Sequence, residues 1–296
     1  MASYVPQAMF DLRGRVAIVT GGGTGIGWMI SKGLAASGAK VYITGRRLDV
    51  LEKAASEWDK AIGGDIVPLQ LDVTDKQSIL AAKARIETEE GRLHILVNNA
   101  GQVGPCSNFF GDPSAPEQKD AETLGQALFN NESFEQWSQL YTINTFSIFF
   151  MTTAFLGLLA KGGEEIPGHW SSVVNITSIS GVMKLAQDHF CYNSSKAAAT
   201  HLTKMLSTEI LLKGYPIRIN AVAPGVYESE MTWHTITPEA VDKVAKGVVP
   251  VPARRPGSGE EVAGTVVYLV SKAGGYTHGQ EIVIDGGALA VNPSVA

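Results

Sequence analysis

The chain has 296 residues, of which 45% are hydrophobic and 18% are charged, and its formal net charge is −5. This composition is typical of a soluble globular protein. The chain has no basic block, so we expect no nucleic-acid or anionic-membrane partner. The two cysteines, Cys106 and Cys191, form no CxxC pair, so we expect neither a structural metal nor a disulfide framework.

Two kinds of segment alternate along the chain. Short apolar runs rich in β-branched residues, typical of buried strands, alternate with longer helix-like segments. The predicted strands are 15–21, 40–46, 66–73, 93–101, 171–178, 216–225 and 281–287, and the predicted helices are about 26–37, 48–61, 75–90, 134–160, 190–213 and 259–271. Such βαβ units predict one α/β domain over 1–296: a doubly wound parallel sheet (Rossmann fold) in three α/β/α layers.

Two long polar segments interrupt this alternation, at about 102–133 and 226–258. Both follow the carboxyl end of a predicted strand, where open α/β sheets bind ligands. Loops of this length in a compact domain are usually functional. We expect the first to be an insertion that acts as a lid or specificity element, and the second to be a substrate loop.

The stretch 138–160 carries no charge and is long enough for a membrane helix. It also contains Asn144, Ser147 and four threonines. These polar side chains favour a helix buried on several faces of a protein, so we expect no membrane partner.

A glycine-rich turn, TGGGTGIG at 20–27, joins the first predicted strand to the first predicted helix. Glycines permit left-handed backbone and close approach of a ligand, and a helix N-terminus offers free N–H groups to a pyrophosphate. The turn therefore predicts a dinucleotide site. Glycine-rich turns also occur without a nucleotide, and the turn alone leaves that alternative open.

The end of the second strand indicates which dinucleotide is bound. NAD-binding enzymes usually place an acid there for the ribose 2′-hydroxyl, whereas this chain has Arg46 and Arg47 after Gly45. A guanidinium suits a 2′-phosphate in charge and geometry. We predict NADP(H) rather than NAD(H); the alternative is that both arginines are solvated charges at a helix start.

Further motifs follow in order through nearly the whole chain. They are an Asp-Val pair at 72–73, NNAG at 98–101, YxxxK at 192–196, PG at 224–225 and DGG at 285–287. With the glycine turn, they make the sequence resemble the short-chain dehydrogenase/reductase family, and within it the 3-oxoacyl-carrier-protein reductases. This resemblance implies an enzyme that interconverts a ketone and a secondary alcohol by hydride transfer with a nicotinamide cofactor.

The resemblance also implies which residues bind the cofactor. The glycine turn would wrap the pyrophosphate, Asp72 would contact the adenine, and the segment after Pro224 would hold the nicotinamide. The expected set is Thr20, Gly21, Thr24, Gly25, Ile26, Gly27, Arg46, Arg47, Asp72, Val73, Asn99, Ala100, Gly101, Tyr192, Lys196, Pro224, Gly225, Val226 and Ser229.

The catalytic residues implied by the resemblance are Asn144, Ser178, Tyr192 and Lys196. A tyrosine with a pKa of about 10 is a poor base at neutral pH. A cation one helical turn away, at Lys196, favours the phenolate and lowers that pKa. Ser178 would polarise the substrate carbonyl, and Asn144, by resemblance, would kink its helix and hold a water in a proton relay.

The assignment of the serine depends on a spacing. Ser178 fits the family pattern Ser-x-x-Gly with Gly181, whereas Ser180 is expected to be a turn residue. The interval from Ser178 to Tyr192 is one residue longer than is usual in the family. This indicates an insertion in the segment before Cys191. The family also has an aspartate where this chain has His94.

The expected substrate is a medium-sized hydrophobic carbonyl compound or alcohol. The segments that should wall it are rich in apolar and aromatic residues: Met183, Leu185, His189, Phe190, Phe109, Phe110, Leu128, Phe129, Tyr227, Met231, Trp233 and His234. A sugar or polyol dehydrogenase of the same family and a non-catalytic NADP(H)-binding sensor remain alternatives. The resemblance further implies a homotetramer or dimer built on helices 134–160 and 190–213. With no signal peptide or retention tail recognised, we expect a cytoplasmic protein.

Overall fold

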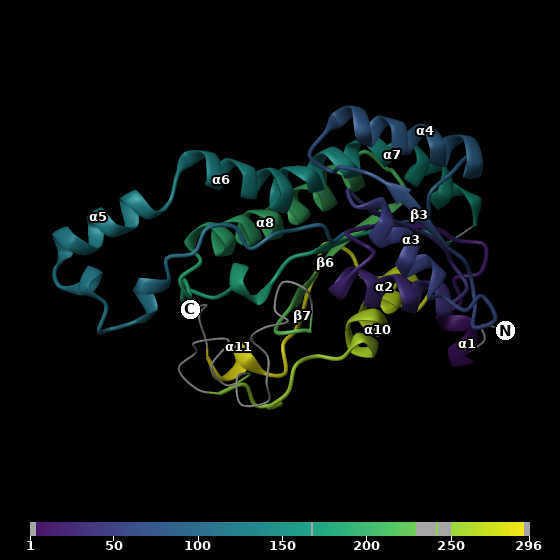
Figure 1. Ribbon diagram of the computed structural model, residues 1–296. Coiled ribbons are helices and arrows are strands. Elements are labelled where there is room, and N and C mark those ends of the chain that lie inside the picture. The colour runs from purple at the N-terminus through teal and green to yellow at the C-terminus, as the bar shows by residue number, and fades with distance from the viewer. Residues whose placement is uncertain (1–3, 167, 229–240, 242–249, 293–296) are drawn as a thin grey trace.

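A computed structural model of the protein describes residues 4–166, 168–228, 241 and 250–292. Across these residues the core is a seven-stranded sheet in the order β3-β2-β1-β4-β5-β6-β7 (Figure 1). Every neighbouring pair is parallel. The strands are β1 (Val16–Thr20), β2 (Lys40–Gly45), β3 (Ile66–Gln70), β4 (Ile95–Asn98), β5 (Ser171–Ile176), β6 (Ile217–Pro224) and β7 (Glu281–Ile284). The predicted doubly wound parallel sheet is confirmed.

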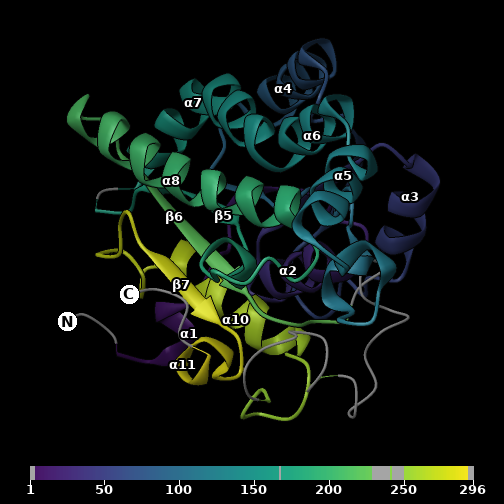
Figure 2. The same cartoon turned by 90° about the vertical axis from the view of Figure 1, so that its left-hand side faces the viewer.

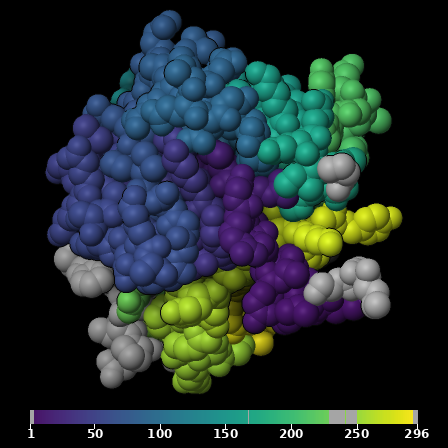
Figure 3. Space-filling model, turned by 90° about the vertical axis from the view of Figure 1, so that its right-hand side faces the viewer, coloured from purple at the N-terminus to yellow at the C-terminus, as the bar shows by residue number. Residues whose placement is uncertain are grey.

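Helices cover both faces of the sheet, as its apolar strands require. Two buried hydrophobic clusters lie one on each face. One face carries α2 (Gly25–Ala36), α3 (Leu48–Ser56) and α10 (Gly259–Val270), and the other carries α4 (Lys76–Glu90), α7 (Ser147–Glu165) and α8 (Phe190–Leu212) (Figures 1 and 2). The short helix α1 (Pro6–Met9) lies beside the end of α10, where Ala273 N–H donates to the Met9 carbonyl (Figure 3).

The predicted helix 134–160 is longer than expected and irregular. It consists of α6 (Phe134–Tyr141), a π-helical turn η3 (Thr142–Phe146) and α7. The whole run, Phe134–Glu165, is long and apolar enough to cross a membrane by length and composition alone, and half of its apolar window is buried within the fold. Met151, Phe155 and Leu159 of α7 are fully buried against the sheet, which is the packing expected of a core helix.

The segment predicted as an insertion, 102–133, extends from the body of the molecule between β4 and α6 (Figure 1). It contains two 3-10 turns, η1 (Asn108–Gly111) and η2 (Pro116–Gln118), and the helix α5 (Ala121–Asn131), which has no buried residue. Most of the predicted substrate loop 226–258 lies outside the described residues. Two further short elements, η4 (Ile179–Gly181) and α11 (Ala288–Val291), follow β5 and β7.

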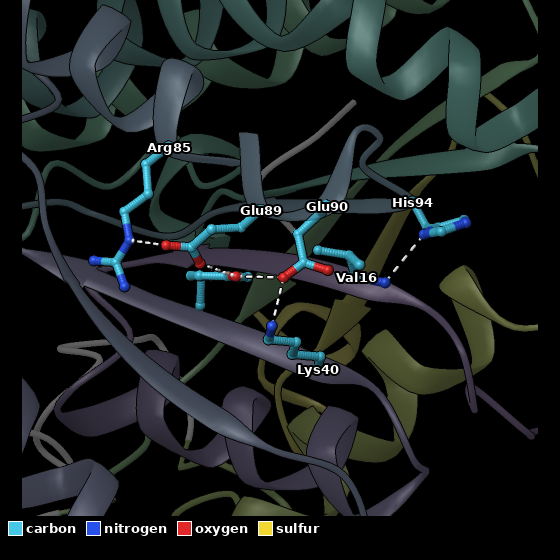
Figure 4. A network of polar contacts seen from close by, with 7 residues as sticks. Val16, Lys40, Arg85, Glu89, Glu90 and His94 are labelled. Atoms are coloured by element: carbon cyan, nitrogen blue, oxygen red, sulfur yellow. Dashed lines mark hydrogen bonds and ion pairs between the residues drawn. The ribbon is translucent and has the colours of Figure 1, made fainter. Parts of the chain in front are cut away.

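His94 fastens the amino-terminal end of β4 to that of β1. Its Nδ1 accepts a hydrogen bond of 3.0 Å from the Val16 N–H (Figure 4), so the neutral ring carries its hydrogen on Nε2, which lies 2.7 Å from Glu165. On the neighbouring strand, Lys40 and the Tyr42 phenol contact Glu90 (Figure 4). His94 thus provides a hydrogen-bond acceptor where the family has an aspartate.

We predict that His94→Leu lowers the free energy of unfolding by about 1–3 kcal/mol, because the buried Val16 N–H loses its acceptor, and that His94→Asn restores part of it. Burial lowers the pKa of His94 below 6.5. The stabilisation by the neutral ring is therefore full above that value and is lost as the pH falls through the lower pKa of the folded state. Urea titrations at neutral and mildly acidic pH test this. The prediction would be contradicted if the free energy of unfolding fell equally with pH in wild type and in His94→Asn. His201→Asn, at an exposed histidine, is the control and should behave like wild type.

Candidate active site

A cleft of about 690 Å³ opens at the carboxyl ends of the central strands. It lies where β1 and β4 adjoin and the strand order reverses, which is the point at which doubly wound sheets bind ligands. Sixteen of the residues predicted from the sequence line it: Gly21, Thr24, Gly25, Ile26, Gly27, Arg46, Arg47, Asp72, Val73, Asn99, Ala100, Gly101, Ser178, Tyr192, Lys196 and Pro224.

The glycine turn is shaped to let a ligand approach the backbone. Gly21 and Gly25 have φ of +62° and +50°, a conformation that favours glycine. A Cβ on Gly27 would lie 2.1 Å from the Gly21 carbonyl oxygen and 2.5 Å from Asn99 Nδ2. The turn leads directly into α2, whose first N–H groups have no partner within the helix. Close backbone packing and a helix N-terminus together fit the pyrophosphate of a dinucleotide.

Thr20 lies behind the cleft and holds its two sides together. Its Oγ1 accepts hydrogen bonds from the N–H groups of Asn99 (2.9 Å) and Ala100 (3.0 Å). The Asn99 side chain in turn donates to the Thr20 carbonyl at 2.9 Å. These bonds lock the end of β1 to the end of β4. Thr20 therefore shapes the site without lining it.

The end of the cleft beside β2 and β3 presents two cations and one fixed carboxylate. Arg46 and Arg47 are exposed at the end of β2 and line the cleft. The Arg46 carbonyl accepts a 2.9 Å bond from Gln70 Nε2, which ties this corner to β3. Asp72 Oδ1 accepts from the N–H and hydroxyl of Thr74 at 2.9 and 2.7 Å, and this holds the carboxylate in place.

Tyr192, Lys196 and Ser178 meet at the inner end of the cleft. Tyr192 and Lys196 lie one turn apart on α8, and Lys196 Nζ is 5.8 Å from the centroid of the tyrosine ring. Lys196 Nζ donates to the Ile176 carbonyl at 2.9 Å. The Ser178 hydroxyl lies close enough to the Tyr192 phenol to influence its pKa, and it accepts from the Ser180 N–H at 3.1 Å. Ser178 therefore adjoins the phenol, and Ser180 supports it through its backbone.

Asn144 lies in the π-helical turn, next to the cleft but not lining it. Its Oδ1 accepts from the Gln102 N–H at 2.9 Å, and its Nδ2 donates to the Gln102 carbonyl at 3.0 Å and to Ser195 Oγ at 3.1 Å. Ser195 Oγ donates to the Tyr192 carbonyl at 2.8 Å. Asn144 thus connects the loop segment after NNAG to α8. Sequence reasoning missed Gln102, which acts through its backbone, and Ser195, whose hydroxyl acts through a contact between distant segments; neither leaves a motif.

Burial dominates the titration of both groups on α8. It raises the pKa of Tyr192, and the hydrogen bond from Ser178 opposes this increase only in part. It lowers the pKa of Lys196 to about 8, because the ammonium loses hydration. The sequence-based hypothesis that the lysine lowers the tyrosine pKa does not describe the net effect in this structure. The phenol stays protonated at neutral pH, and this is the form that donates a proton.

Four of the predicted cofactor-binding residues do not line the cleft or are not described. Thr20 is behind the cleft. The Gly225 N–H donates to the Ile284 carbonyl at 3.0 Å, and Val226 lines a neighbouring pocket of about 530 Å³ with Ile179 and Tyr227. Ser229 falls outside the described residues, as do Met231, Trp233 and His234 of the predicted substrate wall.

A dinucleotide cradle that ends beside a protonated phenol and a buried ammonium is the site of an oxidoreductase that uses a nicotinamide cofactor. Comparison with known proteins agrees. The family profile described as short chain dehydrogenase matches residues 15–240, and the chain belongs to the short-chain dehydrogenase/reductase family.

Relatives align over almost the whole chain. The short-chain dehydrogenase/reductase PhomF of Diaporthe leptostromiformis is 39% identical over 297 residues, covering 99% of this chain and 97% of the relative. Gluconate 5-dehydrogenase of Gluconobacter oxydans is 32% identical, covering 94% and 96%. The solved RhlG/NADP active-site complex of Pseudomonas aeruginosa superposes with a TM-score of 0.79 at 30% identity, covering 95% and 98%.

We predict that Gly27→Ala lowers the affinity for NADPH at least about tenfold, since the added Cβ would lie 2.1 Å from the Gly21 carbonyl and would displace the phosphate turn. Gly125→Ala is the matched control, because its Cβ meets nothing within 4 Å on the exposed helix α5. Fluorescence titration with NADPH, alongside a thermal melt, measures both effects. Equal affinities in the two variants would contradict the assignment of the turn.

Proposed function

We propose that the protein is an NADP(H)-dependent enzyme that interconverts a medium-sized hydrophobic ketone and a secondary alcohol. The observation that carries the proposal is that Ser178, the Tyr192 phenol and the Lys196 ammonium meet in one cleft that begins at a glycine turn. Reduction of a carbonyl requires a hydride at carbon and a proton at oxygen. The dinucleotide cleft fits a cofactor that donates the hydride, and the Tyr192 phenol fits the donor of the proton.

NADPH, when bound, supplies the hydride. The glycine turn and the α2 N-terminus hold its pyrophosphate, and Lys196 holds the nicotinamide ribose. Ser178 donates a hydrogen bond to the substrate carbonyl oxygen, which draws negative charge towards that atom. Tyr192 transfers its phenolic proton to the same oxygen as the alcohol forms, and it takes the proton back in the oxidative direction. The ammonium of Lys196 stabilises the phenolate that remains.

The preference for NADP(H) is supported by charge at the adenosine corner. Arg46 and Arg47 are exposed at the edge of the cleft, and the strand end carries no acid for a 2′-hydroxyl. Guanidinium groups bind phosphate in a forked geometry. A structural relative at 30% identity is described as an NADP complex.

The substrate class is supported by apolar residues that line the cleft or lie just before Tyr192 in the chain. Ile143 and Val103 line the cleft. Phe190, two residues before Tyr192, packs edge-on against Phe110 with 5.1 Å between the ring centroids. A sugar or polyol substrate is the second candidate, favoured by the 32% identity to a gluconate 5-dehydrogenase.

We further propose that the protein is a homotetramer or dimer and that it is cytoplasmic. Apolar residues exposed on α7 and α8 support the assembly. Phe149 and Phe150 of α7 are 43% and 37% exposed, and Met205 and Leu212 of α8 are 51% and 75% exposed. Apolar patches of this kind on soluble proteins usually mark an interaction site.

Sedimentation velocity is expected to give at least twice the chain mass of 31.5 kDa. A species of a single chain's mass at micromolar concentration would contradict this.

We predict that Arg46→Ser/Arg47→Ser raises KM for NADPH at least about tenfold, because two phosphate-binding cations are removed, and changes KM for NADH little. Steady-state kinetics with each cofactor test this prediction. The matched control is Arg85→Ser, whose guanidinium pairs with Glu89 on the distant helix α4. A wild-type preference for NADH would overturn the proposal for NADP(H).

We predict that Tyr192→Phe lowers kcat for ketone reduction by about 10²–10⁴, the usual contribution of a positioned acid, without weakening NADPH binding. Ser178→Ala is expected to lower kcat strongly and Ser180→Ala only slightly, because Ser180 contributes its backbone N–H. A ketone panel followed by absorbance of the reduced nicotinamide measures both. The reverse order of the two serine variants would show that Ser180 is the catalytic serine.

A further inference from the structure

The base of the segment 102–133 is fastened by one carboxylate. Glu132, the residue after α5, accepts a 2.7 Å hydrogen bond from Ser107 Oγ and a 2.6 Å bond from Trp137 Nε1. Ser107 lies where the chain leaves the body of the molecule, and Trp137 lies on α6, where the chain returns. Asn131 reinforces the join, since its Nδ2 donates to Ser107 Oγ at 3.1 Å. We call Ser107, Glu132 and Trp137 the clasp.

The clasp also holds the segment that leads into the catalytic helix. The Ser107 N–H donates to the Asp188 carbonyl at 2.8 Å, and the two residues are 0% and 3% exposed. Gln187 and Asp188 have φ of +53° and +66°. Residues other than glycine keep this conformation only where their surroundings impose it. Asp188 lies four residues before Tyr192.

A second set of hydrogen bonds holds the segment 185–190, and it comes from Asn193 on α8. Asn193 Nδ2 donates to the carbonyls of Leu185 and Ala186 at 2.9 and 3.0 Å. The segment 185–190 is therefore fixed from two directions, by Asn193 and by Ser107. Only the second attachment depends on Glu132.

The charge of Glu132 also acts on the first turn of α8. Burial, and after it the negative charge of Glu132, raises the pKa of the Cys191 thiol to about 11. Cys191 immediately precedes Tyr192. The carboxylate is thus close enough for a change at residue 132 to reach the start of the catalytic helix.

We propose that Glu132 is a positioning residue for substrate binding: the clasp fixes segment 185–190 as the wall of the substrate site beside Tyr192. A carboxylate suits this position because it accepts from both donors at once, whereas an amide would present an N–H group to one of them. This inference rests on the proposed ketone reduction for its kinetic consequence. It rests on the hydrogen bonds alone for its structural one.

The test compares Glu132→Ala and Glu132→Gln with Glu122→Gln, a control on α5 whose carboxylate accepts from Gln126 of the same exposed helix. Losing charge-assisted bonds is expected to raise KM for the best ketone of the panel about tenfold or more in Glu132→Ala, and less in Glu132→Gln. We expect kcat to change by less than about threefold. The Kd for NADPH and all values for Glu122→Gln should match wild type.

Hydrogen exchange gives a second readout that needs no turnover. Amides of 185–190 should exchange faster in both Glu132 variants, while those of α2 should not change. Unchanged KM and unchanged exchange at 185–190 would overturn the inference, and so would an equal loss of NADPH affinity, which would indicate a general structural role. A wild type that binds NADPH but reduces no ketone would refute the proposed function and leave the exchange result to decide the inference.

Discussion

The burial of the Lys196 ammonium is the constraint on which the rest of the site depends. The group is 5% exposed and donates to the Ile176 carbonyl at the end of β5. Loss of hydration lowers its pKa to about 8, so it still carries its charge at neutral pH. The charge is tolerated because the strand end supplies an acceptor and the cleft gives access to a polar ligand. Tyr192 lies one turn before Lys196 on α8, so the helix face that brings the ammonium to Ile176 also directs Tyr192 into the cleft.

The surrounding fold brings this helix to the switch point of the sheet. Thr20 locks the end of β1 to the residues after β4, and Asn144 locks those residues to Ser195 on α8 through the π-helical turn. π-helical turns are rare and occur often at functional sites. Hydrogen bonds between distant segments therefore position a few side chains, and the chemistry follows from where those side chains meet.

Much of this arrangement was predictable from the sequence, because it depends on residue patterns that are local in the chain. Alternating apolar strands and helices predicted the sheet, and the spacing of Tyr192 and Lys196 placed both on one face of a helix. The sequence could not reveal bonds that depend on packing. Gln102 binds Asn144 through its backbone, and Glu132 joins residues far apart in the chain. The net pKa of Tyr192 was misjudged for the same reason, since burial is a property of the fold.

The central claim is that a hydride passes between the cofactor and a carbonyl carbon beside Tyr192. Single-turnover reaction of a ketone with NADPH deuterated at its hydride position, followed by mass spectrometry of the product, tests it most directly. The account predicts one deuterium on the carbinol carbon in wild type and almost none formed on the same timescale by Tyr192→Phe. Alcohol that carries no deuterium at that carbon, or equal product from the phenylalanine variant, would contradict it.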